Sequence, residues 1–296
     1  MQKKLLLIAN PFSGTGKIKS HLFKVVEIFS NADYSVTVYP TKARADATAK
    51  VESLGDGEYD IIVVCGGDGT LNEVITGIMN RKLNCKIGYI PSGTLNEWSS
   101  GLGISRDIEK AAKDITTGKE IMLDIGKFDD KFFTYTASFG AFTSASYSTP
   151  QGVKNVLGQA AYFFEGVKNI GSIKSIPLKL TADGKEVEGK FLFGAISNSM
   201  SVGGIVKFND KLVKLNDGLF EILLIRKPSN LLKLQSIING ILKKDFDREY
   251  IEFLHAKEVT IESDSEIAWT LDGEYAKGKE KIEIANLNNA INFIVP

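Results

Sequence analysis

The chain has 296 residues, of which 43% are hydrophobic and 24% are charged. This ordinary globular balance favours one large domain or two ordinary ones. The 36 Lys and Arg residues equal the 36 Asp and Glu residues, which argues against a nucleic-acid-binding protein and against strong adhesion to anionic membranes. No stretch of about 18 apolar residues predicts a transmembrane helix, and the first apolar run is too short for a signal peptide. We therefore expect a cytoplasmic protein.

Up to about residue 124, compact apolar runs alternate with amphipathic segments. Strands are expected at 5–9, 34–39, 61–65 and 86–91, and helices at about 18–30, 43–54 and from Thr70 onward. This rhythm predicts an α/β domain with a parallel sheet and flanking helices.

Beyond about residue 124, short alternating segments are separated by turn residues, which predicts a mainly antiparallel β-sandwich. The pair Asp183-Gly184 is typical of a hairpin turn. Two stretches, 153–170 and 229–246, have helical spacing instead.

We place the domain boundary at residues 127 and 128. The first domain covers 1–127, and the tail from about 288 to 296 is expected to return to it. The second domain covers 128–287.

Side chains for disulfides and zinc are scarce. Cys65 and Cys85 lie in apolar or mixed surroundings, so a disulfide framework is not expected. His21 and His255 lack metal-ligand spacing, and a zinc site or a Ser/His/Asp triad has little to build on.

One phrase occurs twice, because G-T-L-N-E stands at 69–73 and again at 93–97. Each copy follows a strand, and we expect each threonine to begin the next helix. The carboxyl ends of parallel strands form a crevice in which helix N-termini attract phosphate, and glycines let the backbone approach an anion. The repeat therefore predicts two neighbouring turns that hold one nucleotide. Good turn and capping sequences are the plainer alternative.

Polar side chains of the two copies fit the same interpretation. Thr70 and Thr94 can donate hydroxyl hydrogen bonds, and Asn72 and Asn96 can donate amide ones. Asp68 is the lone acid of G-G-D-G and would repel a phosphate unless Mg²⁺ intervened, which predicts a metal held directly or through water.

The loop S-G-T-G-K at 13–17 looks like the end of a Walker A loop. That motif needs a glycine and a Ser or Thr where this chain has Pro11 and Ile18, so the interpretation fails. The loop can still offer backbone N–H groups to a nucleotide.

The ordered motifs of the chain resemble the diacylglycerol kinase catalytic-domain family, and most of all its soluble bacterial lipid kinases. The resemblance rests on N-P-F-S-G-T-G-K at 10–17, G-G-D-G-T-L-N-E-V at 66–74, P-S-G-T-L-N-E at 91–97, L-D-I-G at 123–126, N-D-G-L-F-E at 216–221 and L-D-G-E at 271–274. It covers essentially the whole chain. It implies an ATP-binding α/β domain of the NAD kinase/diacylglycerol kinase type joined to a β-sandwich domain for the lipid, with the active site in the cleft between them.

The resemblance also assigns roles to individual residues. It makes Glu274 the proton acceptor, with Asp272 essential beside it and Asp68 serving catalysis. The nucleotide contacts that it implies come from Asn10, Thr41, Gly66, Gly67, Asp68, Gly69, Thr70, Leu71, Asn72 and Thr94.

Two magnesium sites follow from the resemblance. One is structural and uses the Asp217 carboxylate with the backbone carbonyls of Lys214 and Leu219. The other is catalytic and is reached through a water-linked network of Asp68, Glu97 and Asp124.

Independently of the family, strand alternation would turn Asp272 and Glu274 to one face. Two nearby acids can divide the labour of a metal neighbour and a base. The alternative is an ordinary hairpin turn, since Asp-Gly is a favoured turn pair.

The chain departs from the family in two places. The segment G-G-I-V-K-F-N-D-K-L-V at 203–213 lacks a proline that is common there, and the motif after the second G-T also differs. The chain has N-E-W-S-S at 96–100, where the family usually has N-D-F-A-R. Glu97 keeps the charge on a longer arm and Ser100 replaces an arginine, which puts the activity level and the substrate in question.

The predicted function is an ATP- and Mg²⁺-dependent transfer of the γ-phosphate to a lipid hydroxyl, with diacylglycerol as the first choice and phosphatidic acid as its product. The alternatives are an NAD kinase-like or sphingosine kinase-like phosphotransferase, or a nucleotide-binding regulator with little catalysis. We expect a lipid partner met transiently at the inner membrane surface, no nucleic-acid partner, and a homodimer as one option.

Two segments could contribute to lipid binding. Residues 229–244 are amphipathic, and their lysines could face anionic lipid, although a helix packed on the sandwich explains them as well. Residues 141–168 could line an acyl-chain groove, although plain core packing also fits.

Overall fold

A computed structural model describes residues 2–14, 16–94, 96–140, 174–202, 206–208 and 213–296. The chain forms two compact units, residues 1–125 with 289–296, and residues 126–288. The division that we predicted from the sequence differs from these units by one or two residues at each boundary.

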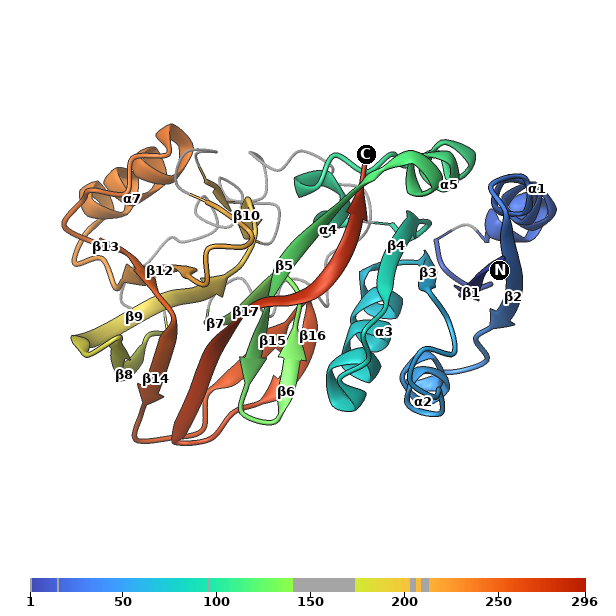
Figure 1. The fold of residues 1–296 in the computed structure, drawn as a ribbon. Helices are drawn as coiled ribbons and strands as arrows, with labels where there is room; N and C mark the ends of the chain where they lie inside the picture. The colour runs from blue at the N-terminus through green and yellow to red at the C-terminus, as the bar shows by residue number, and fades with distance from the viewer. Residues whose placement is uncertain (1, 15, 95, 141–173, 203–205, 209–212) are drawn as a thin grey trace. The chain divides into compact units, whose positions relative to one another are not determined.

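The first unit is built on a parallel sheet with the strand order β2-β1-β3-β4 and the end of β17 beside β4. Figure 1 shows its strands and helices in blue, cyan and green, joined by the red end of β17. β3 and residues 5–9 of β1 are buried apolar runs, as expected for parallel strands covered on both faces. The strands are β1 (Lys3–Ala9), β2 (Tyr34–Pro40), β3 (Ile61–Gly66) and β4 (Lys86–Pro91).

Five helices accompany this sheet: α1 (Ile18–Asn31), α2 (Asp46–Glu52), α3 (Asp68–Arg81), α4 (Glu97–Gly101) and α5 (Ile108–Thr117). The sequence predicts α1, α2 and α3, and these predictions are confirmed within a few residues. None of the helices in the described parts of the chain is long and apolar enough to cross a membrane.

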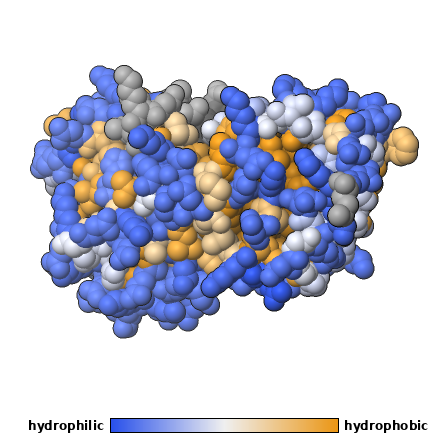
Figure 2. All heavy atoms as spheres, in the orientation of Figure 1, coloured by the Kyte–Doolittle hydropathy of each residue, from blue (hydrophilic) through white to orange (hydrophobic). Residues whose placement is uncertain are grey.

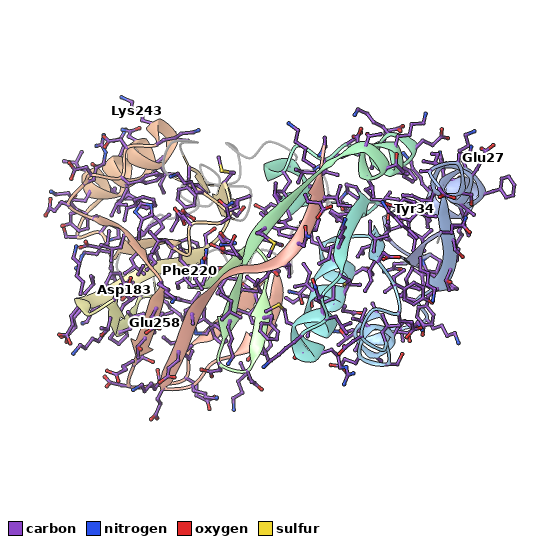
Figure 3. The ribbon with its side chains drawn as sticks, viewed as in Figure 1. Glu27, Tyr34, Asp183, Phe220, Lys243 and Glu258 are labelled. Carbon is purple, nitrogen blue, oxygen red and sulfur yellow. The ribbon has the colours of Figure 1, made fainter. Side chains whose placement is uncertain are left out.

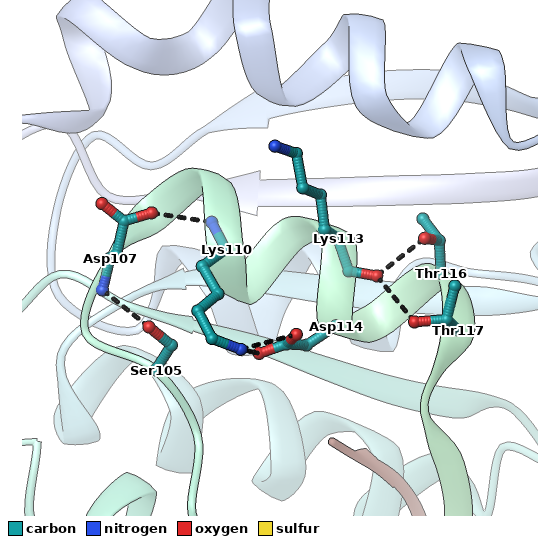
Figure 4. Close-up of polar contacts among 7 residues, drawn as sticks. All are labelled: Ser105, Asp107, Lys110, Lys113, Asp114, Thr116 and Thr117. Atoms are coloured by element: carbon teal, nitrogen blue, oxygen red, sulfur yellow. Dashed lines mark hydrogen bonds and ion pairs between the residues drawn. The ribbon is translucent and has the colours of Figure 1, made fainter.

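Helix α5 has a clear N-cap (Figure 4). An Asp107 carboxylate oxygen accepts a hydrogen bond from the Lys110 backbone N–H at 2.7 Å, and the Lys110 ammonium contacts Asp114 at 2.8 Å. A cap of this kind satisfies one of the unpaired amides of the first turn.

The second unit is an antiparallel β-structure with the order β16-β15-β7-β9-β8-β14-β17, in which β12 joins β9 to β13 and β5 pairs with β6. β5 and β17 are long strands that run from one unit into the other along the chain. The bounds are β5 (Lys119–Phe128), β6 (Lys131–Phe133), β7 (Thr136–Gly140), β8 (Ile176–Ala182), β9 (Lys185–Ser197), β10 (Ser201–Val202), β11 (Val206–Lys207), β12 (Phe220–Arg226), β13 (Ile251–Ala256), β14 (Glu258–Glu262), β15 (Ala268–Leu271), β16 (Glu274–Lys277) and β17 (Lys281–Val295).

The Asp183-Gly184 pair forms the predicted hairpin between β8 and β9. Both residues have positive φ, 44° and 84°, as a type I′ turn requires. The Asp183 carboxylate also accepts a hydrogen bond from the backbone N–H of Glu258 at 2.8 Å, and the two residues lie side by side in Figure 3.

Side chains of strand β12 point alternately to its two faces and so pack into two different hydrophobic cores. Phe220, Ile222 and Leu224 belong to the larger core of the unit. Leu223 and Ile225 belong to a second core, which is covered by helix α7 (Leu231–Lys243). The predicted helix at 229–246 is thus confirmed. The helix predicted at 153–170 and the whole segment 141–168 lie outside the described residues.

Candidate nucleotide and acceptor sites

The two copies of G-T-L-N-E lie next to each other at the carboxyl edge of the parallel sheet. Their parent strands β3 and β4 are paired up to Gly66 and Pro91, and the Ser92 N–H donates to the Gly66 carbonyl at 2.8 Å. A Cβ placed on Gly93 would lie only 2.6 Å from the Gly67 Cα. The predicted juxtaposition of the two turns is confirmed.

The first copy lies within helix α3. The helix begins at Asp68, after Gly67 in an extended conformation, so the expectation that Thr70 begins the helix is wrong. An acid in the first turn is favourable because the helix dipole is positive there. This helix N-terminus lies at the carboxyl edge of the sheet, and backbone N–H groups at such a position can bind an anion.

Thr70 and Asn10 are brought together by this arrangement. Thr70 is buried, and its hydroxyl accepts a hydrogen bond from the Asn10 side-chain amide at 3.0 Å. The Asn10 backbone N–H donates to the Cys65 carbonyl at 2.8 Å. Asn10 therefore ties the loop after β1 to the loop after β3.

The glycines of the first copy differ in the space around them. A Cβ on Gly66 would lie 2.6 Å from the Thr70 Cβ, so this glycine is needed for packing. A Cβ on Gly69 would meet nothing within 4 Å. The helix thus leaves open space at Gly69, where a ligand can approach the backbone.

The loop at 10–17 also approaches the second copy. Gly14 has a φ of 55°, and a Cβ there would lie 2.3 Å from the Ser92 carbonyl oxygen. A Cβ on Gly67 would lie 3.5 Å from the Ser13 hydroxyl. Three glycine-containing loops therefore converge at one edge of the sheet.

The second copy forms a bend rather than a helix start. Asn96 has a φ of 48°, its Oδ1 accepts from the Gly93 N–H at 2.9 Å, and its Nδ2 donates to the Gly93 carbonyl at 2.7 Å. Helix α4 begins only at Glu97, and Thr94 is exposed. The expectation that Thr94 begins the next helix is wrong, because Asn96 holds the preceding residues in the bend.

Asp68 links the two copies. One carboxylate oxygen accepts from the Glu97 N–H at 2.9 Å, and the other lies 3.5 Å from the Tyr89 hydroxyl, which also contacts the Asn96 Oδ1 at 3.3 Å. Burial, and next the negative charge of Asp68, raise the pKa of Tyr89 well above its ordinary value, so its hydroxyl remains a donor. Tyr89 was not among the predicted site residues, and Asn96, which was expected to donate its amide to the nucleotide, donates it to the Gly93 carbonyl instead.

The other predicted site residues of this unit, Asp124, Thr41, Leu71 and Asn72, each have different contacts. Asp124 is fully buried and accepts from the Asn289 N–H at 2.7 Å. Thr41 is buried, and its N–H donates to the Ala9 carbonyl at 2.9 Å. Leu71 packs its side chain in the core, so only its backbone can contact a ligand, whereas Asn72 is half-buried.

The carboxylates of Asp68, Glu97 and Asp124 supply the oxygen ligands that Mg²⁺ prefers. Within the described ranges, however, no group of three or more His, Cys, Asp or Glu side chains is arranged to hold a metal directly. A site that joins these acids therefore needs water as part of its ligand set, and the water-linked network stays a prediction.

In the second unit, Asp272 is a buried carboxylate that accepts several hydrogen bonds. They come from the backbone N–H groups of Thr134, Tyr135 and Thr136 at 2.6, 2.9 and 3.0 Å, and from the Thr134 hydroxyl at 2.8 Å. Burial raises the pKa of Asp272, and these hydrogen bonds oppose the rise. The carboxylate therefore anchors its own turn to the segment between β6 and β7.

Asp272 and Glu274 do not share a face. Leu271 pairs with Glu274, and Asp272 and Gly273 have φ values of 49° and 83°, so the chain reverses between the two acids. The prediction from strand alternation is wrong because a type I′ turn intervenes. Asp272 points inward, and Glu274 is exposed.

Other buried polar groups border this turn. The Tyr135 carbonyl accepts from the Ser197 hydroxyl at 3.1 Å and from the Asn198 N–H at 2.9 Å. A Cβ on Gly273 would lie 3.8 Å from the Tyr135 hydroxyl. The sequence reasoning missed these residues, although the polar side chains within the apolar run F-F-T-Y-T-A-S-F could have signalled them.

The N-D-G turn holds the residues of the predicted structural magnesium site. Asp217 is exposed, and its carboxylate accepts from the Leu219 N–H at 3.1 Å. Gly218 has a φ of 80°, a conformation that glycine adopts without strain in a tight turn. A carboxylate and nearby carbonyls are a fitting donor set for Mg²⁺, and this site too stays a prediction.

The cysteines are not candidates for catalysis. Both are free, as expected, and burial raises the pKa of Cys65 to about 12 and that of Cys85 to about 11. Thiols with such values are weak nucleophiles near neutral pH.

Known proteins share both units of this fold. Residues 4–128 match the diacylglycerol kinase catalytic domain, and residues 138–293 match the YegS C-terminal NAD kinase beta sandwich-like domain. A diacylglycerol kinase of Bacillus subtilis (strain 168) is 32% identical over 99% of this chain and 97% of its own length. A diacylglycerol kinase of Staphylococcus aureus (strain MRSA252) is 32% identical over 100% of this chain and 93% of its own length.

A solved structure agrees with these relatives. A crystal structure described as a candidate diacylglycerol kinase from Bacillus anthracis str. Sterne has a TM-score of 0.81 and 28% identity, and the match covers 100% of this chain and 95% of the other. The parallel unit with its glycine loops and the antiparallel unit thus define a phosphotransferase with an alcohol group as acceptor. The chain belongs to the diacylglycerol kinase family.

Proposed function

We propose that the protein transfers the γ-phosphate of ATP, in the presence of Mg²⁺, to the hydroxyl of diacylglycerol and releases phosphatidic acid. The observation that carries the proposal is the pair of adjacent G-T-L-N-E turns, with open space at Gly69, in a chain of this family. The names of the Bacillus subtilis and Staphylococcus aureus relatives support diacylglycerol as the acceptor.

The first unit binds the nucleotide in this proposal. Backbone N–H groups at the start of α3 and in the converging glycine loops donate hydrogen bonds to the phosphates, because a helix N-terminus attracts anions. The Asn10–Thr70 contact holds two of these loops in place. Mg²⁺ near Asp68 neutralises the charge of the phosphates when it is bound.

The second unit supplies the base. Glu274 takes the proton from the acceptor hydroxyl while the oxygen attacks the γ-phosphorus. Its exposure leaves the carboxylate accessible to a substrate, whereas the oxygens of Asp272 already accept hydrogen bonds from residues 134–136. Asp272 is therefore a positioning residue that fixes the turn on which Glu274 stands.

The proposal is tested with labelled ATP, Mg²⁺ and a total lipid extract, followed by identification of the labelled lipid. We expect Glu274→Gln to bind ATP as the wild type does and to lower kcat by about 100-fold or more, which is the usual contribution of a general base. Glu280→Gln, a change of another exposed acid in the same unit, is the matched control and should keep full activity.

Other outcomes contradict separate parts of the proposal. Normal transfer by Glu274→Gln would assign the proton to another group. Labelling of a different lipid alcohol would leave the chemistry standing and replace the acceptor. Binding of ATP without labelling of any lipid would favour a nucleotide-binding regulator.

A further inference from the structure

Helix α7 carries apolar side chains both on the face that packs on the protein and on the face exposed to solvent. Leu234, Ile237 and Ile241 are buried against the second core of the sandwich unit. Leu231, Leu232 and Leu242 are instead 61%, 77% and 46% exposed. A helix that covers a core in a soluble protein ordinarily carries charged or polar residues on its outward side.

Two of the three exposed leucines, Leu231 and Leu242, lie on one line along the helix. Leu231, Gln235, Ile238 and Leu242 are spaced i, i+4, i+7 and i+11, which is the spacing of one helical face. At 100° per residue, Leu231 and Leu242 differ by about 20° in direction and lie about 16 Å apart along the axis. Leu232 lies about 100° from this line, on the side of the helix away from the core, and Ile238 is partly buried against the second core. We call the exposed Leu231, Leu232 and Leu242, together with Ile238 between them, the outer stripe. In the space-filling view, orange atoms stand among the blue ones in the region of α7 (Figure 2).

The charge of the helix has one sign. The sequence of α7, L-L-K-L-Q-S-I-I-N-G-I-L-K, contains no acid. Lys243 is exposed at the C-terminal end of α7 (Figure 3). Lys244 donates a hydrogen bond to the backbone carbonyl of Phe208, and a neutral carbonyl does not cancel the charge of the ammonium group.

Two of the three acids that follow the helix are engaged in ion pairs. Asp245 pairs with Arg248 at 2.7 Å, and Glu249 pairs with Lys233. The third, Asp247, is exposed, and the two positive charges of Lys243 and Lys244 outnumber its single negative charge. Apolar side chains flanked by lysines match the boundary between the acyl chains and the headgroups of an anionic bilayer.

We propose that the outer stripe of α7 docks on the surface of a bilayer that contains anionic phospholipid, with the helix parallel to the surface. The leucines enter the headgroup and acyl boundary, and Lys243 contacts the lipid phosphates. The choice of a bilayer rests on the proposed function, because a diacylglycerol acceptor resides in a membrane. Three partly exposed leucines fall well short of the roughly 800 Å² per partner that a stable protein interface buries, which disfavours a second copy of the chain.

The test is co-sedimentation of the full chain with vesicles of phosphatidylcholine alone or of equal parts phosphatidylcholine and phosphatidylglycerol. The variant Leu231→Gln/Leu232→Gln/Leu242→Gln should bind the anionic vesicles at least about tenfold more weakly, because burial of even one leucine side chain is worth about that factor. Lys243→Gln should weaken binding to the anionic vesicles about fivefold and leave binding to neutral vesicles unchanged.

Phe23→Gln is the matched control. Phe23 is 84% exposed on α1 of the other unit, so its loss tests whether any exposed apolar side chain promotes binding. We expect no change. The proposal is overturned if the triple variant sediments like the wild type, or if Phe23→Gln weakens binding as much as the triple variant does.

Folding and catalysis are measured separately. Thermal unfolding followed by circular dichroism shows whether the triple variant is folded, and Leu232→Gln alone, with an expected loss of a few fold in binding, replaces it if it is not. Transfer to a short-chain diacylglycerol without vesicles should be unchanged in the folded variants. If the wild type labels no lipid but vesicle binding still depends on the outer stripe, the proposed function fails and the docking surface stands.

Discussion

The two copies of G-T-L-N-E have the same residues and different conformations. In the copy at 69–73 every residue lies inside α3, whereas the copy at 93–97 has a left-handed Asn96 and enters helix α4 only at its last residue, Glu97. Thr70 is buried and Thr94 is exposed, and the reverse holds for the asparagines, since Asn72 is half-buried and Asn96 is buried.

The preceding residues explain this difference. Asp68 follows an extended Gly67 and lies in the first turn of α3, where the helix dipole favours an acid. The second copy follows Pro91 and Ser92, and there the Asn96 side chain closes on both backbone groups of Gly93. The first copy therefore forms the start of a helix, and the second forms a bend whose Glu97 N–H donates to the Asp68 carboxylate of that helix.

The largest expected effect separates the two glycines. Gly93→Ala should lower the free energy of unfolding by about 3 kcal/mol or more, because its Cβ would lie 2.6 Å from the Gly67 Cα and 2.7 Å from the Asn96 Oδ1, and the backbone must shift. Gly69→Ala should raise the free energy of unfolding by about 0.5–1 kcal/mol, because alanine is the better helix former. Urea unfolding of the two variants measures both changes.

Gly69→Ala also tests the nucleotide site. The new methyl group enters open space in the protein, so it should weaken ATP binding while the fold gains stability. Titration calorimetry with ATP and Mg²⁺ measures the binding. Unchanged affinity would show that the nucleotide lies away from the first turn of α3.

The second effect separates the two asparagines. Asn96→Ala removes the two hydrogen bonds to Gly93 and places alanine at a φ of 48°, so we expect a loss of about 2–3 kcal/mol in unfolding free energy. Asn72→Ala lies in a helix and should change it by less than about 1 kcal/mol. Equal losses in the two variants would mean that the bend does not depend on the asparagine side chain.

Much of the fold could be predicted from the sequence, because the signals were local. Buried apolar runs such as Ile61–Gly66 and the Asp183-Gly184 turn give strands and a hairpin without knowledge of distant residues. Helix α5 was missed, although Asp107 before a helical spacing of Ile108, Ala111, Ala112 and Ile115 was a readable signal.

The site was harder to predict because its contacts are long-range. The hydrogen bonds of Asp272 come from residues 134–136, which nothing near L-D-G-E announces. Asp68 binds the Glu97 amide, a contact that depends on how β3 and β4 pair. The motif gives the residue types, and the sheet topology decides which of them meet.

The smallest expected effect separates the two threonines. Thr70→Val removes the acceptor of the Asn10 amide in a buried position, and one such hydrogen bond contributes about 1 kcal/mol to the free energy of unfolding. Thr94→Val at an exposed position should change it by less than about 0.5 kcal/mol. The double-mutant cycle of Thr70→Val with Asn10→Ala isolates the pair, and a coupling energy near zero would contradict the view that Asn10 and Thr70 fasten the loop after β1 to the first copy. A measurable coupling energy would show that the Asn10–Thr70 hydrogen bond stabilises the buried position of Thr70. The exposed Thr94 would then differ from Thr70 in its contribution to stability.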